Sequence, residues 1–523
     1  MQNSSALAQE NESLQRQLDA LKHKLHIVTQ NNSQLQNEIQ LLHEKIKLLN
    51  LRQFSSKSEA HLLQQNLFDE LDVADSDSEP QLDNDTLEIT YTRKRKPTRK
   101  VLPKNLPRFD TIVDIDEAAK VCACGCTKVR MGEKVSEQLD IVPAKVQVLR
   151  TIRPQYVCKS CDSDTISIAK LPQRLLPKSM LSEGALAHIV VAKYVDHMPL
   201  YRQSVYWSRQ GIELPRNTLC NSLMKVYDTL EPIAALLQAA CLQTRYLQAD
   251  ETVVQVLSEE ERANQQTSYL WVYRGGPPTA PIIYYDYQPT RSEIHPKTIL
   301  KDYQGYLQTD AYGGYNWSND NNTITHLYCM AHARRPFAEV VKMNKHQAPG
   351  VAHQVLADFT QLYHIEREAK SLSAQERYQC RQEKSKPILD KLFAYLEQIA
   401  SKVPPKGKLG QAIDYMLKRK AGFLIYLEDG HLSIDNNPIE NTIRPVALGR
   451  KNWLFLGSPR GAKAAALYFS LIQTAKANNI EPYRYLRALF EKLPFAKTKD
   501  DFANLLPHNI FQQNNKDTPA LVA

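Results

Sequence analysis

Residues 432–455 read LSIDNNPIENTIRPVALGRKNWLF, and this stretch predicts a helix with an acidic residue in its first turn. Asn437 occupies the position of a helix N-cap, and Pro438 follows where a missing N–H costs nothing. Glu440 lies two residues after Pro438, with Arg444 one turn further along the helix. A simpler interpretation is that Glu440 only completes a capping box that begins at Asn437.

Two aspartates upstream give Glu440 a second interpretation. Asp250 lies within an apolar run at residues 246–256, and Asp310 ends another at residues 306–310. The length and alternation of both runs predict strands. Three carboxylates from two strands and a helix can hold two divalent ions for phosphoryl transfer, because cations such as Mg²⁺ prefer oxygen ligands.

Three neighbouring acids are weaker candidates for the same site. Glu251 alternates to the opposite face of the strand from Asp250. Asp286 lies on a different strand, and Asp435 precedes the helix of Glu440, where we expect it to serve the helix cap. The sequence therefore favours Asp250, Asp310 and Glu440.

Length and charge limit the classes of protein to consider. A chain of 523 residues is too long for one hydrophobic core, so we expect about three or four domains. The net charge of +9 favours a polyanionic partner such as nucleic acid. The sequence has no apolar run long enough to span a bilayer and no signal-peptide pattern. We expect a cytoplasmic, nucleoid-associated protein without a membrane partner.

A seven-residue repeat of apolar side chains in residues 1–55 predicts a coiled coil. One seam, assigned to d positions, contains Leu7, Leu14, Leu21, Val28, Leu35, Leu42 and Leu49. The other, at a positions, contains Leu18, Leu25, Ile39 and Ile46, together with Asn11 and Asn32. Asparagine at a positions tends to specify a two-stranded register, so we expect a homo-oligomer, most simply a dimer. The alternative is a long amphipathic helix packed on its own chain.

Residues 56–108 predict a disordered linker whose charge reverses along its length. An acidic run at residues 69–85 precedes the basic run at residues 93–100. The basic run could contact DNA phosphates through counterion release, or it could be a solvated tail.

A cluster of cysteines predicts a zinc ribbon in residues 109–170. In a cytosolic chain, such a cluster indicates metal binding rather than disulfides. Strand-like segments at residues 137–141 and 146–152 separate its two halves, and four thiolates would hold one structural Zn²⁺. We expect Cys158 and Cys161 to bind the ion with two of the first three cysteines, and the spacing leaves open which two. The cluster consists of Cys122, Cys124, Cys126, Cys158 and Cys161.

Residues 171–243 predict several helices, with breaks at residues 197–199 and 211–215. Residues 200–219 have the spacing of a helix-turn-helix, with the second helix capped by Asn217 or Thr218. Such a hairpin either contacts DNA or is a plain packing unit. The candidate DNA contacts are Arg202, Arg209 and Arg216.

The remaining segments predict an α/β catalytic core. Strand-like residues 268–274 and 281–287 follow the Asp250 strand, and a strand and helix alternation comes after them. This order fits a ribonuclease H-like core, a mixed sheet flanked by helices, in residues 244–343 and 431–490. Residues 344–430 are a helical insertion that separates the second acid from the third, and residues 491–523 form a C-terminal tail. The expected fold class is thus multidomain α/β, with the coiled coil, zinc ribbon and helix-turn-helix-like segment before the core.

The chain resembles DDE transposases of the insertion sequence 66 family over nearly its whole length. The first similar segments are the end of the zipper at residues 51–59 and the zinc-binding segment at residues 132–145 and 153–158. The blocks QADET, TDAYG and NNPIENTIRP, at residues 248–252, 309–313 and 436–445, are similar to the catalytic blocks of the family. Residues 505–508 resemble its C-terminal tail. The first cysteine group departs from the family, since it reads C-x-C-G-C where adjacent cysteines are expected.

This resemblance implies a function for the three acids. Asp250, Asp310 and Glu440 would be the catalytic triad that binds two Mg²⁺ or Mn²⁺ ions. The enzyme would bind the terminal inverted repeats of its element, cleave DNA and transfer the strand to target DNA. Accessory proteins encoded by the same element are possible partners. Cys329 and His332 resemble a Cys-x-x-His feature near such sites, with a structural or a catalytic role. Candidate phosphate contacts are Arg334, Arg335, Arg444, Arg450 and Lys451.

Two other functions remain as alternatives. A catalytically inactive DNA-binding regulator would keep the zipper, the ribbon and the helical hairpin but would not need the three acids. A ribonuclease H-like nuclease would have little need for the zipper and the ribbon upstream. The presence of all these features favours the transposase.

Overall fold

The computed structural model describes residues 146–156, 167–343 and 349–511, with scattered helical positions between residues 22 and 46. The chain divides into two compact units, residues 1–56 with 172–523, and residues 57–171. The five cysteines of the predicted zinc site, the linker and the predicted strand at residues 137–141 lie outside the described residues.

Four apolar positions of the predicted zipper are among the described residues. They are helical, and each side chain is between 51% and 55% exposed. Leu35 and Leu42 belong to one predicted seam, and Ile39 and Ile46 to the other. The coiled coil and the dimer stay predictions.

In the smaller unit, a short antiparallel pair is formed by β1 (Gln155–Tyr156) and β2 (Ser167–Ile168). The strand predicted at residues 146–152 is wrong, since these residues have no regular secondary structure. Their alternating apolar side chains have no partner strand among the described residues, and Val148 is 86% exposed. A strand depends on the hydrogen bonds of a neighbouring ladder, which the sequence pattern alone cannot supply.

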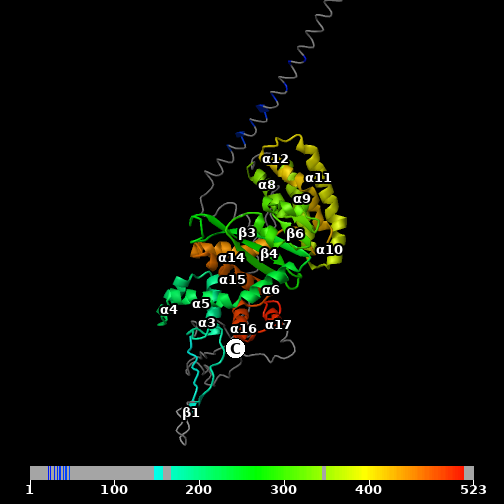
Figure 1. Cartoon of the computed structure of the whole chain (residues 1–523). Coiled ribbons are helices and arrows are strands. Elements are labelled where there is room, and N and C mark those ends of the chain that lie inside the picture. The colour runs from blue at the N-terminus through cyan, green and yellow to red at the C-terminus, as the bar shows by residue number, and fades with distance from the viewer. Residues whose placement is uncertain are drawn as a thin grey trace, which may run out of the picture. The chain divides into compact units, whose positions relative to one another are not determined.

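The larger unit contains a five-stranded mixed sheet, with the strand order β5-β4-β3-β6-β7 (Figure 1). The strands β3, β4 and β5 pair antiparallel, and β6 and β7 continue the sheet parallel to β3. The strands predicted at residues 268–274 and 281–287 are confirmed. The five strands are β3 (Tyr246–Gln255), β4 (Thr267–Gly275), β5 (Ile282–Gln288), β6 (Gly305–Thr309) and β7 (Ile324–Tyr328).

Between residues 183 and 242, four helices lead up to the sheet and confirm the breaks predicted at residues 197–199 and 211–215. They are α3 (Glu183–Tyr194), α4 (Leu200–Arg209), α5 (Arg216–Thr229) and α6 (Glu231–Leu242). Gly211 adopts a φ of +76° in the turn between α4 and α5, a conformation open to glycine at little cost. The predicted cap of α5 at Asn217 or Thr218 is wrong, because Pro215 is the N-cap. Proline fixes φ near −60°, so it sets the entry into the helix without a side-chain hydrogen bond.

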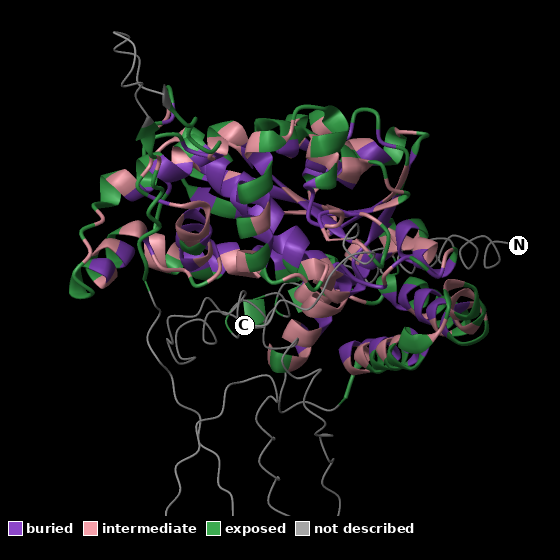
Figure 2. Cartoon of the chain, turned by 90° about the horizontal axis from the view of Figure 1, so that it is seen from below, coloured by how far each residue is buried: buried purple, intermediate pink, exposed green. Residues whose placement is uncertain are grey.

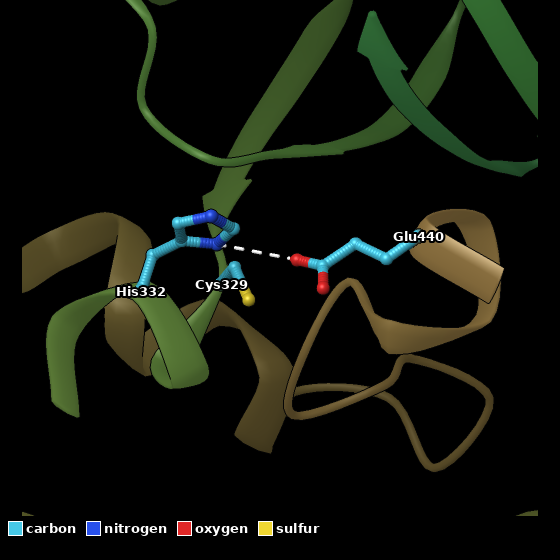
Figure 3. Close-up of side chains that lie close together, drawn as sticks. All are labelled: Cys329, His332 and Glu440. Atoms are coloured by element: carbon cyan, nitrogen blue, oxygen red, sulfur yellow. Dashed lines mark ion pairs between the residues drawn. The ribbon is translucent and has the colours of Figure 1, made fainter. Parts of the chain in front are cut away.

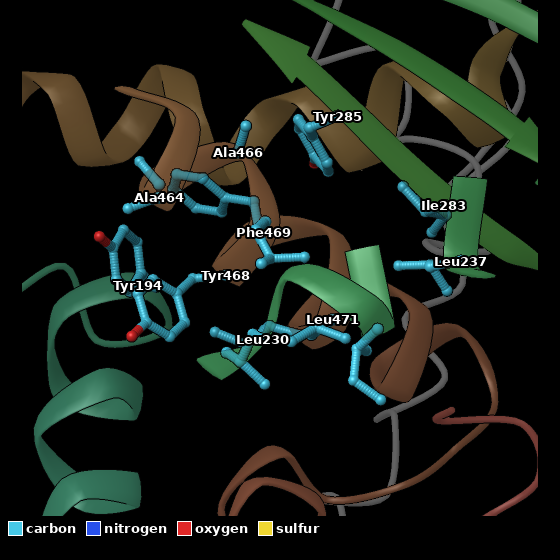
Figure 4. Packing of buried hydrophobic residues seen from close by; sticks show 14 of the residues in the cluster. Tyr194, Leu230, Leu237, Ile283, Tyr285, Ala464, Ala466, Tyr468, Phe469 and Leu471 are labelled. Carbon is cyan, nitrogen blue, oxygen red and sulfur yellow. The ribbon is translucent and has the colours of Figure 1, made fainter. Parts of the chain in front are cut away.

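The helix α15 (Pro459–Ala477) is the centre of the main hydrophobic core. Ser458 caps its start by accepting a hydrogen bond from the Gly461 N–H at 3.1 Å. Nearly all of the helix from Ala462 to Ala475 is buried, as expected for a helix covered on every side. Figure 4 shows Phe469 amid this packing, with its ring 5.1 Å from that of Tyr194 and 5.7 Å from that of Tyr285.

A second hydrophobic core lies in the helices that follow β7, drawn from green to yellow in Figure 1. The described part of the predicted insertion is helical, as expected. The helices are α8 (Met330–Met343), α9 (Val351–Glu368), α10 (Ala374–Cys380), α11 (Lys386–Ala400), α12 (Lys408–Lys418) and α13 (Lys420–Leu424).

Arg381 joins this helical lobe to the chain that leads toward Glu440. It is 1% exposed and pairs with Glu366 at 2.7 Å. Its guanidinium also donates to the backbone carbonyls of Tyr426, Asp429 and Leu432. A buried charge is tolerated here because its hydrogen-bonding groups have partners.

Beyond α14 (Asn437–Trp453) and α15, the chain continues into α16 (Pro482–Lys492) and α17 (Lys499–Asn504). The predicted tail begins inside α16, and Leu505, Leu506 and Ile510 are buried in the main core. Figure 2 shows that buried residues gather on the inward faces of helices and strands, with exposed residues on the outer faces.

Hydroxyl groups of α15 form hydrogen bonds with backbone groups on the outer edge of β5. The Thr474 hydroxyl accepts from the Ile283 N–H and donates to the Ile283 carbonyl, both at 3.0 Å. Ser470 accepts from the Tyr285 N–H at 2.8 Å. Edge strands need such cover because their backbone groups have no further strand to pair with.

We expect Thr474→Val to lower the free energy of unfolding by about 1–3 kcal/mol, because valine keeps the volume but leaves two buried backbone groups without a partner. Chemical denaturation measures this change. The control is Thr360→Val on α9, an exposed position whose hydroxyl bonds only to its own helix. An equal effect of both substitutions would contradict the role of Thr474.

Candidate active site

A buried loop, residues 433–436, places the start of α14 against the sheet. Gln248 of β3 donates to the Asp435 carbonyl at 3.2 Å, and Gln308 of β6 donates to the Ser433 carbonyl at 2.9 Å. Both glutamine side chains are fully buried. The Asn436 side chain donates to the Ala249 carbonyl at 3.2 Å, next to Asp250. The loop is therefore fixed to the two strands that lead to the predicted aspartates.

The start of α8 is fixed to the same loop. The Met330 N–H donates to the Ile434 carbonyl at 3.1 Å, and the Cys329 N–H donates to the Thr309 carbonyl at 3.0 Å. In return, the Asn436 N–H donates to Cys329 Sγ at 3.1 Å. Three segments distant in sequence thus meet beside Asp310 and Asp250.

The start of α14 differs from the prediction by one residue. Its N-cap is Asn436, not Asn437, and the Asn436 side chain makes no capping hydrogen bond. Asp435 supports the helix start as expected, accepting from the Asn437 N–H at 3.1 Å. The capping box proposed for Glu440 is wrong, since Asn437 is not the cap and its N–H is bound to Asp435.

The far end of α14 is tied to the end of β3. The Arg450 guanidinium donates to the Val253 carbonyl at 2.6 Å. After the helix, the Leu456 N–H donates to the Gln255 carbonyl at 2.9 Å. Both ends of α14 are therefore attached to β3, which keeps Glu440 near the Asp250 strand.

The three predicted acids lie within electrostatic reach of one another. Burial raises the pKa of Asp250 well above its ordinary range, and the negative charges of Asp310, Glu251 and Glu440 raise it further. Glu440 itself is only 2% exposed. The fold brings Asp250, Asp310 and Glu440 together, across 190 residues of sequence.

Asp310 is held by a tight turn after β6. Its Oδ1 accepts from the Tyr312 N–H at 2.9 Å, as in an Asx turn. Ala311, between them, has a φ of +67°, which is unfavourable for a residue with a Cβ. This local strain is supported by the surrounding structure and fixes the direction of the Asp310 side chain.

Arg291 and Tyr312 are neighbours of the acids that the sequence did not reveal. The Arg291 guanidinium donates to Glu251 at 2.6 Å and lies 3.7 Å from the centre of the Tyr312 ring. Burial and the Asp310 charge raise the pKa of Glu251 to about 7, although Arg291 opposes this shift. Tyr312 belongs to the TDAYG block, but no sequence pattern places Arg291 here.

Cys329 and His332 lie next to Glu440 (Figure 3). His332 Nδ1 is 3.6 Å from Glu440 Oε1. Burial lowers the pKa of His332 to about 4, against the raising effect of Asp310, so its imidazole is neutral near pH 7. Burial also raises the pKa of the Cys329 thiol, and the Asp435 and Glu440 charges add to this shift.

A cavity of about 350 Å³ opens beside α14, which lines it with Asn441, Arg444, Pro445 and Leu448. Its cationic lining groups are Arg444 and Lys476, and His197, whose pKa is lowered by burial and by the Lys476 charge, lines it as well. Lys476 comes from the end of α15, and His197 from the break between α3 and α4. A phosphate group matches the charge of this lining.

The other basic candidates lie in several places. Arg202, Arg209, Arg216 and Lys451 are exposed, and Arg334 and Arg335 are partly buried on α8. Arg202 donates to Asn452 Oδ1 at 3.2 Å, which connects α4 to the end of α14.

The weaker acidic candidate Asp286 is not among the charges that shift the pKa of Asp250, and its own pKa is raised to about 6 by burial.

Comparison with protein families gives the relationship of the chain. The model described as the Transposase IS66 family matches residues 178–464, which include all three acids. The chain belongs to the IS66 transposase family. The zinc-finger binding domain of transposase IS66 matches residues 119–162, and the IS66 C-terminal element matches residues 470–508. A model described as Transposase C of IS166 homeodomain matches residues 41–111.

Relatives of this transposase-family chain occur in Sinorhizobium fredii (strain NBRC 101917 / NGR234). The chain is 33% identical to the uncharacterised protein y4jD over 422 residues, covering 78% of this chain and 81% of the relative. It is 32% identical to the uncharacterised protein y4hP over 425 residues, covering 77% of this chain and 75% of that relative.

Within the described residues, none of the helices combines the length and hydropathy of a bilayer-spanning segment.

We expect Asp250→Asn to raise the melting temperature by a few degrees at neutral pH without divalent ions. The folded-state pKa of Asp250 is raised, so its charge opposes folding above the ordinary pKa of 3.8. Asparagine keeps the oxygen that accepts from the Glu251 N–H. Thermal denaturation checks this, and the wild type should gain more from added Mg²⁺ than the variant.

The control for this substitution is Asp302→Asn, which removes an exposed carboxylate from outside the cluster. Its melting temperature should stay near that of the wild type with and without Mg²⁺. A lower melting temperature for Asp250→Asn than for the wild type in the absence of divalent ions would argue against repulsion among the acids.

Proposed function

We propose that this chain is a DDE-type DNA transposase, which binds the terminal inverted repeats of its element and catalyses two-metal DNA cleavage and strand transfer. The observation that carries the proposal is the electrostatic influence of Asp310 and Glu440 on Asp250. The sheet supports a ribonuclease H-like core, since three antiparallel strands are followed by two strands parallel to β3. Membership of the IS66 transposase family agrees with this assignment.

The residues present fit a pair of hard divalent ions. Asp310 and Glu440 lie close enough to Asp250 for their charges to raise its pKa, so a cation there would relieve the repulsion among the three carboxylates. Oxygen ligands of this kind suit Mg²⁺ or Mn²⁺. When bound, two such ions would stabilise the attacking and leaving oxygens of phosphoryl transfer.

The main role of the surrounding protein groups would be to hold and orient the three carboxylates. The Asx turn at Asp310 and the two attachments of α14 to β3 fix the carboxylates before DNA arrives. Such preorganisation lowers the cost of reaching the reactive geometry. A fourth carboxylate beside the site, that of Glu251, is paired with the Arg291 guanidinium.

DNA contacts would come from basic groups around this centre. Arg444 and Lys476, together with His197, line the cavity beside α14 and would contact backbone phosphates of the bound DNA. The exposed arginines of α4 and α5 would contact DNA as in a helix-turn-helix, and the other basic candidates would add phosphate contacts.

The remaining parts of the proposal concern the segments before residue 171. One structural Zn²⁺ would be bound by four of the five clustered cysteines, a role supported by the match to the IS66 zinc-finger domain. The zipper would form a dimer, and element-encoded accessory proteins would assist. Such an enzyme would work on DNA in the bacterial cytoplasm, at the nucleoid.

We expect Asp250→Asn, Asp310→Asn and Glu440→Gln each to reduce strand transfer to below about one hundredth of the wild-type rate, because loss of groups that only support metal ligands already costs about 10–100-fold. Each substitution removes one charge from the cluster at nearly constant volume. The assay joins a DNA end with a free 3′-hydroxyl to target DNA in the presence of Mg²⁺ or Mn²⁺.

Binding to the terminal repeats, measured in parallel, should survive in all three variants. Asp302→Asn should retain both activities. Retained strand transfer in any of the three acid variants would refute the triad. Hydrolysis of RNA–DNA hybrids without strand transfer would favour the nuclease alternative, and DNA binding without any cleavage by the wild type would favour the regulator.

We expect Lys476→Ala and Arg444→Ala to weaken DNA binding about equally for all sequences, because phosphates carry no base identity. The slope of log affinity against log salt should fall by about one for each phosphate that is no longer neutralised by a side chain. The control is Lys391→Ala, which removes an exposed lysine from α11 in the helical lobe. An unchanged slope for both cavity variants would exclude the cavity as a phosphate site.

A further inference from the structure

Three different ligand types meet beside the acid cluster. Cys329 Sγ, a ring nitrogen of His332 and a carboxylate oxygen of Glu440 all lie within 4.8 Å of one another. Figure 3 shows the three side chains directed toward a common point from the start of α8 and the first turn of α14. The cysteine and histidine belong to one Cys-x-x-His turn.

The distance between His332 and Glu440 suits a shared cation better than a hydrogen bond. His332 Nδ1 and Glu440 Oε1 are 3.6 Å apart, longer than the roughly 3.2 Å limit of a good hydrogen bond. In a tetrahedral zinc site with bonds of about 2.1 Å, two such ligand atoms are roughly 3.4 Å apart. Nδ1 is buried and, among the described residues, has no hydrogen-bond partner.

The surroundings of the cysteine also suit a metal-bound sulfur. The Asn436 N–H donates to Sγ at 3.1 Å from the N-cap of α14. A donated backbone N–H stabilises negative charge on sulfur. The carboxylate of Asp310 acts on His332, and that of Asp435 acts on Cys329, so a cation would enter a region of negative potential.

The donor set separates this site from the proposed magnesium pair. A thiolate, an imidazole and a carboxylate are ligands of zinc-class ions, whereas Mg²⁺ prefers oxygen alone. Three protein ligands leave a fourth position, as in zinc sites that accept an outside ligand. On binding, the metal ion would replace the thiol proton, which is released to solvent.

We propose that Cys329, His332 and Glu440 form a binding site for one zinc-class ion. This site is distinct from the predicted zinc ribbon, whose cysteines all lie before residue 162. It goes beyond the proposed function, and it would hold its ion without DNA. Because Glu440 belongs to both ligand sets, a zinc-class ion and the magnesium pair compete for this carboxylate.

Cobalt binding to the full-length protein tests the site, because Co²⁺ replaces Zn²⁺ and a thiolate ligand adds a near-ultraviolet charge-transfer band. Metal-free wild type and Cys329→Ser are titrated with Co²⁺, and bound cobalt per chain is measured. We expect the wild type to bind one more cobalt ion per chain than the variant. The cysteines of the ribbon contribute equally to both proteins, so the difference spectrum isolates the band of Cys329.

The matched control is Cys220→Ser, which alters an exposed cysteine on α5 and should leave the cobalt count and the spectrum unchanged. If Cys329→Ser fails to fold, as judged by thermal denaturation, His332→Asn serves instead, since it removes one ligand and retains the thiol. Equal cobalt counts and superimposable spectra for the wild type and a folded variant would overturn the site. Since the readout needs no DNA and no catalysis, loss of strand transfer in the acid variants leaves this result unaffected.

Discussion

The candidate site depends on the burial of one asparagine between three segments. The Asn436 side chain donates to the β3 backbone at Ala249, and its own N–H donates to Cys329 Sγ. It is fully buried, so these polar groups cannot exchange their partners for water without cost. The position of Glu440 relative to Asp250 and Asp310 therefore depends on the hydrogen bonds that hold residues 433–436 against the sheet.

The charged groups of the site are placed where they do not favour folding. The pKa of Asp250 is raised by burial and by neighbouring acids, and the pKa of His332 is lowered to about 4 by burial. Both shifts indicate that the charged form of the side chain lost hydration that its new surroundings do not fully replace. The large apolar cores around α15 and in the helical lobe make this arrangement possible. Stability supplied by distant packing supports a site that is organised for binding cations and phosphates.

The sequence was a good guide wherever a local pattern specified the structure. The strands of the sheet, the breaks around residues 197–199 and 211–215, and the helical insertion follow from alternation, proline and glycine. Helix caps were less predictable. Asn436, Asn437 and Asp435 all have side chains able to cap α14, and the choice among them depends on contacts with Ala249 and Cys329 that are distant in sequence. The strand expected at residues 146–152 likewise required a partner.

By itself, the sequence identified Asp250, Asp310 and Glu440 as candidate metal ligands, because local patterns place two of these acids on strands and one in the first turn of a helix. It also determined the Cys-x-x-His spacing of Cys329 and His332. Only the tertiary structure decided that His332 Nδ1 lies 3.6 Å from Glu440, that Arg291 pairs with Glu251, and that Lys476 shares a cavity with Arg444. The physical reason is that these contacts join residues 32 to 108 positions apart, and their geometry is set by sheet pairing and core packing rather than by local propensity.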